Sequence, residues 1–323
     1  MAHAVETMLT VGTPPWHQLG VILDNPPTIE EAIRLAGLDW QVELQKLYLA
    51  EGQLVEDARA TVRTSDNSVL GIVGPRFVPL QNRNAFHWFN PFIESGEATI
   101  ESAGSLKEGR RVWVLAKIAG LQMDITQSDP VRAYILLAHA HDGTLAIRVG
   151  FTPIRVVCNN TLSYAVNEDS GSRLIRVKHT EGAVEALDDI REVMNVAKQG
   201  FEATADQYRR LAARQVNQVD LETYVKRVAS NMIDVEDRTA EELEAAYEKG
   251  ARVAGRILPL FETGRGNDLP GTRGTLWAAY NAVTEFTTHE RGRSVDTRLE
   301  SLWFGQSANM NKAALDIALQ MAA

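Results

Sequence analysis

The feature that most constrains the fold is a change in the spacing of apolar residues near residue 181. From about residue 59 to residue 180, apolar and polar residues alternate with a period of two, as in strands that bury one face. From residue 181 onward, apolar residues recur every three or four positions, as they do along one face of a helix. Strands followed by helices predict an α+β fold, with an antiparallel β-hairpin/helix core and a C-terminal helical region.

Three segments follow from this change: 1–58, an acidic N-terminal arm and short helix; 59–180, a β-rich core; and 181–323, a helical C-terminal region. Glycine and proline interrupt the first 27 residues, so we expect an extended arm whose Trp16 must find a packing partner, in this chain or in a neighbouring subunit. Thr28 and Glu31 have the spacing of a capping box, which opens a short helix ending near Gly37.

Turn residues place the elements of the core and of the helical region. Predicted hairpins pair residues 60–62 with 69–73, 98–103 with 110–118, and 134–140 with 145–149, and a last strand covers 172–179. A helical pattern over 82–94 is disturbed by Pro91. The helical region predicts a first helix of more than 30 residues from 181, and further helices near 220–232, 239–258, 274–290 and 307–321.

Composition excludes several classes of protein. A single cysteine, Cys158, excludes an internal disulfide and a paired-cysteine zinc or redox site. No apolar run approaches the roughly 18 residues of a membrane helix, and no secretory signal is evident, so we expect a cytoplasmic protein. The sequence contains no phosphate-binding loop, dinucleotide-binding glycine motif or metalloprotease motif, so no cofactor is expected.

Charge is unevenly distributed within the overall net charge of −9. Residues 1–58 carry nine carboxylates and two cations, whereas residues 59–180 carry fourteen cations and ten carboxylates. The overall acidity argues against a protein that coats nucleic acid through bulk charge, but a local basic groove in the middle segment remains open. The acidic and basic segments could also attract each other, within a chain or between subunits.

Cations mixed with aromatic residues in the middle segment indicate a site for single-stranded nucleic acid, because cations contact phosphates while aromatic rings stack on bases. The alternative is that these cations protect strand edges from aggregation. The candidate nucleic-acid-binding residues are Arg76, Lys107, Arg110, Arg111, Trp113, Arg155, Asn159, Arg176 and Lys178.

Four other groups of residues each leave alternative interpretations open. Asn159 and Asn160 either contact a base or phosphate or cap a following helix, and Cys158 between apolar and amide neighbours is either a buried small residue or a nucleophile. His139, His141 and Asp142 either belong to a metal site or include an ordinary turn aspartate. Asn281, Glu285 and His289 form either a structural hydrogen-bond network or half of a metal or acid/base site. We assign no catalytic or metal-binding residue.

Motifs along nearly the whole chain resemble those of a family of phage- and plasmid-encoded proteins of uncharacterised function. They are Met1–His3 with Glu6–Met8, Pro15-Trp16-His17-x-x-Gly20, Ala36–Trp40, Ala103–Leu106 with Gly109–Trp113, His141–Gly143, Arg155–Leu162, and Leu276-Trp277-x-x-Tyr280–Glu285. The resemblance implies an origin in a mobile element and a place in the bacterial or phage-infected cytoplasm. It implies no particular activity.

The succession of hairpins, helix and basic middle segment is also similar to the core of phage single-strand annealing recombinases of the Erf and Beta kind. This similarity implies a homo-oligomeric ring or filament that binds single-stranded DNA and anneals it in recombination, without ATP. Two alternatives remain: a metal-dependent enzyme acting on nucleic acid, and a non-catalytic assembly or host-interaction protein, which the net acidity favours.

Overall fold

The computed structural model describes residues 5–12, 20–157, 160–161, 175–188, 192–231, 239–292, 298, 301–303 and 305–323. The chain forms two compact units, and each is assembled from three separate stretches. The first unit contains Met1–Gly120, Tyr134–Phe151 and Gly171–Ala197; the second contains Leu121–Ala133, Thr152–Ser170 and Lys198–Ala323. The predicted segments are consecutive, whereas both units combine residues that lie far apart in the sequence.

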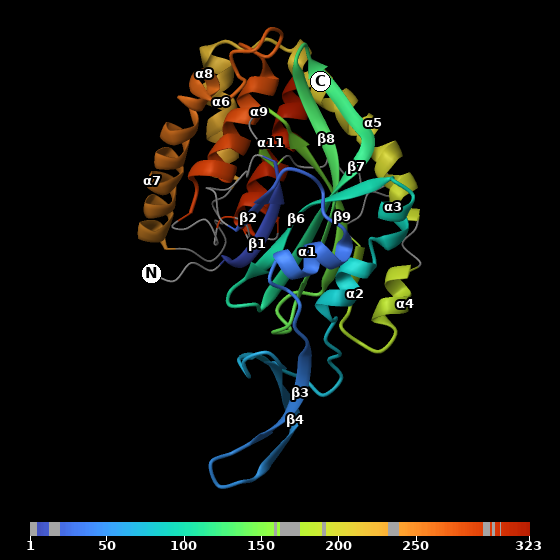
Figure 1. Cartoon of the computed structure of the whole chain (residues 1–323). Helices are drawn as coiled ribbons and strands as arrows, with labels where there is room; N and C mark the ends of the chain where they lie inside the picture. Colours follow the sequence, from blue (N-terminus) through green and yellow to red (C-terminus); the bar gives the residue numbers. More distant parts are fainter. Residues whose placement is uncertain are drawn as a thin grey trace. The chain divides into compact units, whose positions relative to one another are not determined.

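The strands of the described residues form two sheets (Figure 1). The larger has the order β10-β9-β8-β7-β6-β1-β2, with β11 pairing with β9 beside this path, and the smaller has the order β3-β4-β5. The strands are β1 (Val5–Val11), β2 (Val21–Leu23), β3 (Val42–Tyr48), β4 (Leu54–Arg63), β5 (Val69–Val73), β6 (Ala98–Leu106), β7 (Arg111–Thr126), β8 (Asp129–Ala140), β9 (Ile147–Arg155), β10 (Asn160–Thr161) and β11 (Ile175–Val177).

Short helices accompany the strands, and longer ones follow them. They are α1 (Ile29–Leu35), α2 (Asn82–His87), α3 (Asn90–Glu94), α4 (Ala183–Asp188), α5 (Glu192–Ala213), α6 (Gln218–Ser230), α7 (Ala240–Ile257), α8 (Leu260–Thr263), α9 (Leu276–Glu285), the π-helical turn η2 (Phe286–Glu290) and α11 (Gln306–Ala322). This arrangement confirms the predicted α+β fold with its C-terminal helical region. None of the described helices is both long and apolar enough to cross a membrane.

Local signals explain the elements that match the prediction. Thr28 caps α1 by accepting a hydrogen bond from the Glu31 amide while the Glu31 carboxylate accepts one from the Thr28 amide, and Gly37 follows with a φ of 66°. The β6–β7 turn places Lys107 and Glu108 at positive φ, which suits the twist of a tight hairpin. The predicted helix over 82–94 is divided into α2 and α3, with Pro91 in the first turn of α3.

The predicted N-terminal arm is wrong for residues 5–11, because they form β1 in the larger sheet. β1 pairs antiparallel with β6, with Leu9 opposite Ala103, and both side chains are fully buried. Gly104 allows this close approach, since a Cβ there would lie 2.5 Å from both the Thr7 carbonyl oxygen and the Trp113 ring. This pairing joins residues almost a hundred positions apart. Trp16 lies outside the described residues.

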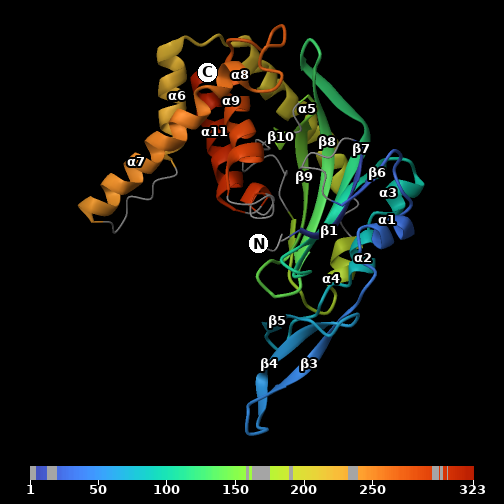
Figure 2. The ribbon, with the colours of Figure 1, turned by 60° about the vertical axis from the view of Figure 1, so that its left-hand side comes forward.

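The smaller sheet extends away from helices α1 and α2 as a ribbon (Figures 1 and 2). β4 pairs with β5 only over residues 59–62, so the outer part of β3 and β4 is a two-stranded ribbon. At its end, Tyr48 is 59% exposed and Leu49 is 51% exposed. The ribbon is therefore anchored at β5 and presents apolar side chains to solvent at its outer end.

Where the sequence predicts a single helix from residue 181, the structure has two helices, α4 and α5. The residues between them, 189–191, lie outside the described part. The helices predicted near 220–232, 239–258, 274–290 and 307–321 correspond to α6, α7, α9 with η2, and α11. In the second unit, the rings of Tyr208, Trp277 and Tyr280 pack against each other with centroids 4.9 to 6.0 Å apart. All three side chains are fully buried and form the centre of this unit's core.

Candidate nucleic-acid interface

Three arginines of the first unit lie close together on the larger sheet. Arg148 of β9 is directly opposite Arg176 of β11 in the antiparallel register. Burial lowers the pKa of the Arg148 guanidinium, and the positive charges of Arg176 and Arg111 lower it further. Like charges placed directly opposite each other on a sheet are unfavourable. This arrangement therefore concentrates positive charge where an anion would stabilise it.

Arg111 is oriented by the turn between β8 and β9. Its guanidinium donates a hydrogen bond of 3.0 Å to the Thr144 hydroxyl. That hydroxyl, together with the Thr144 amide, donates to a carboxylate oxygen of Asp142, over 2.6 and 2.9 Å. The hydrogen bonds from Arg111 to Thr144 and from Thr144 to Asp142 thus fix the position of the arginine side chain on the sheet.

A pocket of about 520 Å³ in the first unit brings together two of the predicted cations, Arg76 and Lys178. Both side chains are exposed. Phe77 and His179 also line the pocket, and their rings are stacked with centroids 4.7 Å apart. Lys178 follows β11, two residues after Arg176. We refer to Arg76, Arg111, Arg148, Arg176 and Lys178 as the basic surface.

Lys107 and Arg110 lie at the β6–β7 turn. Arg110 is exposed and lies 3.8 Å from the Glu108 carboxylate, an ion pair that solvent weakens. Lys107 is half-buried at the same turn. Both cations belong to the first unit, and neither lines the pocket that contains Arg76 and Lys178.

Two predicted residues are placed where the expected contact does not fit. Trp113 is 1% exposed and packs beside β1, so its ring has no open face for stacking on a base. Arg155 is fully buried in the second unit, where its guanidinium donates to both carboxylate oxygens of Asp129 over 2.7 Å. Since neither side chain reaches solvent, the alternation of residues in these strands does not identify an exposed face.

Arg155 and Asp129 are the centre of a buried polar network that the sequence did not reveal. The Asp129 carboxylate also accepts from the Thr272 hydroxyl at 3.0 Å and from the Trp277 indole N–H at 2.9 Å. The Arg155 guanidinium also donates to the Gly266 carbonyl at 2.7 Å and to the Asn267 side-chain carbonyl at 3.1 Å. A buried ion pair with its remaining donors and acceptors satisfied is a structural element of the second unit.

Asn159 and Cys158 lie outside the described residues. Asn160 belongs to β10, where its backbone pairs with that of Arg155 on β9. The helix that Asn160 was predicted to cap falls within residues 162–174, which lie outside the described residues, so the cap interpretation stays a prediction.

The histidines proposed as metal ligands are buried in the first unit. The rings of His139 and His141 lie 4.8 Å apart at 89°, and His179 lies 6.1 Å from His139. Nε2 of His141 is 3.0 Å from the side-chain oxygen of Asn82. Burial lowers the pKa of His139 well below its ordinary value, and burial followed by the charge of His179 lowers the pKa of His141 to about 3.

The predicted third ligand, Asp142, accepts hydrogen bonds within its own turn. Throughout the part of the chain that the structure describes, no three His, Cys, Asp or Glu side chains are placed to hold a metal ion. The buried histidines therefore form an uncharged cluster in the core of the first unit at neutral pH.

The second proposed set, Asn281, Glu285 and His289, keeps its α-helical spacing only between Asn281 and Glu285, which both lie in α9. The Arg291 amide donates to the Phe286 carbonyl five residues before it, so η2 widens the helix immediately after Glu285. The Asn281 side-chain amide donates to the Trp277 carbonyl at 2.9 Å, and the Glu285 carboxylate lies 3.6 Å from the Arg265 guanidinium. These contacts agree with the structural network that the spacing also allowed.

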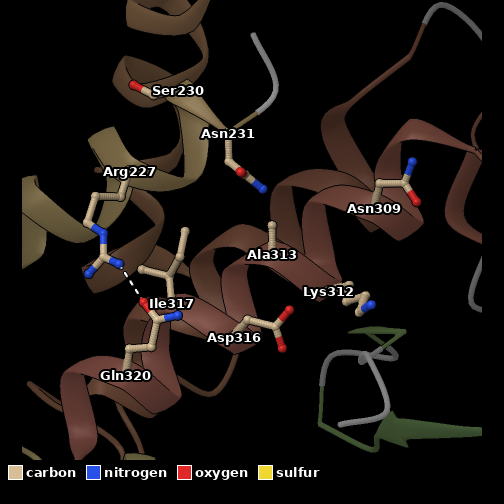
Figure 3. Close-up of a pocket in the computed structure, with 9 residues that line it drawn as sticks. All are labelled: Arg227, Ser230, Asn231, Asn309, Lys312, Ala313, Asp316, Ile317 and Gln320. Carbon is tan, nitrogen blue, oxygen red and sulfur yellow. Dashed lines mark hydrogen bonds between the residues drawn. The ribbon is translucent and has the colours of Figure 1, made fainter. Parts of the chain in front are cut away.

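A polar groove of about 760 Å³ lies between α6 and α11 of the second unit (Figure 3). The Arg227 guanidinium donates to the Gln320 side chain at 2.6 Å across it. Lys312 and Asp316 stand one turn apart on α11, and burial raises the pKa of Asp316. The groove combines both signs of charge, so it lacks the positive character of the basic surface.

A comparison with protein families matches residues 69–303 to a domain of unknown function, DUF932. The chain belongs to the DUF932 family. The DUF932 region begins at β5 and includes the whole basic surface, whereas β1 to β4 lie before it. This agrees with the resemblance to a family of uncharacterised function. No curated protein and no solved structure gives a significant match to the chain.

Proposed function

We propose that this DUF932 protein binds single-stranded DNA through the basic surface and anneals complementary strands as a homo-oligomer. The binding is non-covalent and uses no nucleotide cofactor. The proposal includes a role in phage-type recombination in the cytoplasm of a bacterial host, and the resemblance to proteins of mobile elements supports it. The observation that supports the proposal best is the opposition of Arg148 and Arg176 beside Arg111.

Electrostatics favours a local contact of this kind. The net charge of −9 repels nucleic acid at long range, so binding depends on the few cations that contact phosphates directly. Each contacted phosphate of a single strand releases counterions and contributes about 0.7 to the slope of log affinity against log salt. Affinity is therefore expected to be moderate and to decrease steeply with salt.

The test is fluorescence anisotropy of a labelled oligothymidine, titrated at several salt concentrations between about 50 and 200 mM. Replacing two exposed cations of the basic surface, Arg176→Ala with Lys178→Ala, should weaken binding and lower the salt slope by about 1.4. The matched control is Lys226→Ala with Arg252→Ala, which removes the same charge from exposed positions on α6 and α7. Equal affinities for the two double variants would refute the interface.

Self-association is the second part of the proposal, and we assign it to the outer end of the β3–β4 ribbon. A two-stranded ribbon is marginally stable in water unless another element packs on it. Tyr48 and Leu49 present an apolar end, while Glu51, Glu56 and Asp57 around it repel nucleic acid. A second copy of the chain therefore fits this end better than a DNA strand does.

Light scattering tests the assembly directly. Tyr48→Ser with Leu49→Ser should lower the mass of the oligomer, because the apolar end of the ribbon is removed. The control is Val219→Ser, which replaces an apolar side chain that is 72% exposed on α6. If the ribbon variant keeps the mass of the unmodified protein, assembly uses another surface. Annealing of labelled complementary strands is then measured on each variant.

A further inference from the structure

The pocket that contains Arg76 and Lys178 has features beyond positive charge. Its volume of about 520 Å³ lies within the range of about 300–1,000 Å³ typical of small-ligand sites. Gly74, Pro75 and Gly143 contribute backbone walls with little side chain. A Cβ at Gly74 would meet nothing within 4 Å, so this wall is open. The pocket therefore has room beside its cations for a flat group.

Phe77 supplies a ring in this pocket, and the structure holds that ring in place. Its ring stacks on His179 with an interplanar angle of 25°. His179 is 8% exposed and its Nε2 lies 3.2 Å from the Leu145 carbonyl oxygen. The backbone of the same segment is fixed because the Val78 amide donates to the His179 carbonyl at 3.0 Å. The half-buried Phe77 ring thus rests on a rigid support.

The arrangement of one aromatic ring between two cations fits one nucleotide of a single strand, that is, a base with a phosphate on either side. A base offers a flat face for stacking on an aromatic ring, and the phosphates on either side of it need cations. Arg76 is adjacent to Phe77 in the sequence, and Lys178 is adjacent to His179 beneath it. The two exposed cations therefore flank the stacked rings.

We propose that this pocket holds one base of the bound strand, stacked on Phe77, with the neighbouring phosphates at Arg76 and Lys178. The inference rests on the proposed binding of single strands and adds the subsite that recognises bases. It predicts that the protein distinguishes a strand with bases from a strand of equal charge without them.

The experiment compares an oligothymidine with an abasic oligonucleotide of the same length and phosphate number. For the unmodified protein, the oligothymidine should bind about 5- to 150-fold more tightly, which corresponds to the usual contribution of one stacked base. Phe77→Leu should remove this preference and leave the affinity for the abasic strand and the salt slope unchanged. Phe77→Tyr should retain the preference, because it keeps the aromatic face.

The outcomes separate this inference from the function on which it rests. If neither oligonucleotide binds the unmodified protein, both proposals are wrong. If both bind with equal affinity, or if Phe77→Leu keeps the preference for bases, strand binding stands and the base subsite is wrong. If a Phe77 variant does not fold, the affinities of the unmodified protein for the two oligonucleotides still test whether it recognises bases.

Discussion

The buried histidine cluster makes the stability of the first unit dependent on pH. Burial favours the uncharged imidazole, so His139 and His141 have pKa values below those of the unfolded chain. Below the ordinary pKa of about 6.5, the unfolded chain takes up protons that the folded protein does not. The contribution of the uncharged histidines to stability is therefore fully present above a pH of about 6.5, and it is lost as the pH falls from there towards 3.

The magnitude follows from His141, whose pKa in the folded protein is about 3. Against an unfolded value of 6.5, linkage gives a loss of about 2 kcal/mol at pH 5 relative to pH 8 from this residue alone. His139 shifts in the same direction and adds to the loss. A change of this size is a substantial part of the stability of an ordinary domain.

Denaturant unfolding at pH 8 and pH 5, followed by tryptophan fluorescence, measures this loss. The ring of Trp40 lies 5.4 Å from that of His141, so its emission reports on this part of the core. His141→Gln removes the titrating group, and the difference in unfolding free energy between the two pH values should decrease by about 2 kcal/mol. Asn84→Gln, which changes no titrating group at an exposed position on α2, is the control and should leave that difference unchanged.

The reasoning is refuted if the His141 variant loses as much stability between pH 8 and pH 5 as the unmodified protein does. That result would mean that the imidazole titrates in the folded protein nearly as it does in the unfolded chain. The absolute stability of the variant does not affect this conclusion, because the comparison uses only the pH dependence.

Three further substitutions test the structure. Asp129→Asn leaves the Arg155 charge buried without a counterion and should destabilise the second unit by about 3–5 kcal/mol in urea unfolding, whereas replacing both residues by apolar ones should cost less. Gly104→Ala places a methyl group against Trp113 and should cost about 1–3 kcal/mol, measured as a lower urea midpoint. Thr28→Ala removes the α1 cap and should cost about 1 kcal/mol by the same assay, with a Ser variant restoring it.

The elements that the sequence predicts correctly are those whose signals are local. The turn at residues 107–109 and the cap at Thr28 each depend on a few adjacent residues, and both are present. β1 was missed because its strand character comes from pairing with β6, almost a hundred residues away. A stretch followed by glycine and prolines has no local signal that would distinguish a sheet strand from an arm.

Long-range pairing also explains which site residues could be predicted. In a strand with one open face, alternation identifies the exposed residues, and Arg176 and Lys178 follow this rule. Trp113 lies on a strand whose neighbours bury both faces, so alternation carries no information there. Arg155 finds its counterion 26 residues earlier in the chain, on the adjacent strand β8, and no spacing rule links such a pair.

The two arginines, Arg155 and Arg148, show why burial and partners together decide what a cation on a strand can do. Both belong to β9 and both are withdrawn from solvent to some degree. Arg155 is fully buried, and its guanidinium donates to the Asp129 carboxylate and to the Arg265 carbonyl, so its charge is compensated within the fold. Arg148 is half-buried and lies opposite Arg176, so burial and the neighbouring positive charges lower the pKa of its guanidinium. Under the proposed function, the phosphates of a bound strand would add negative charge beside Arg148 and Arg176, whereas the charge of Arg155 is already paired with Asp129.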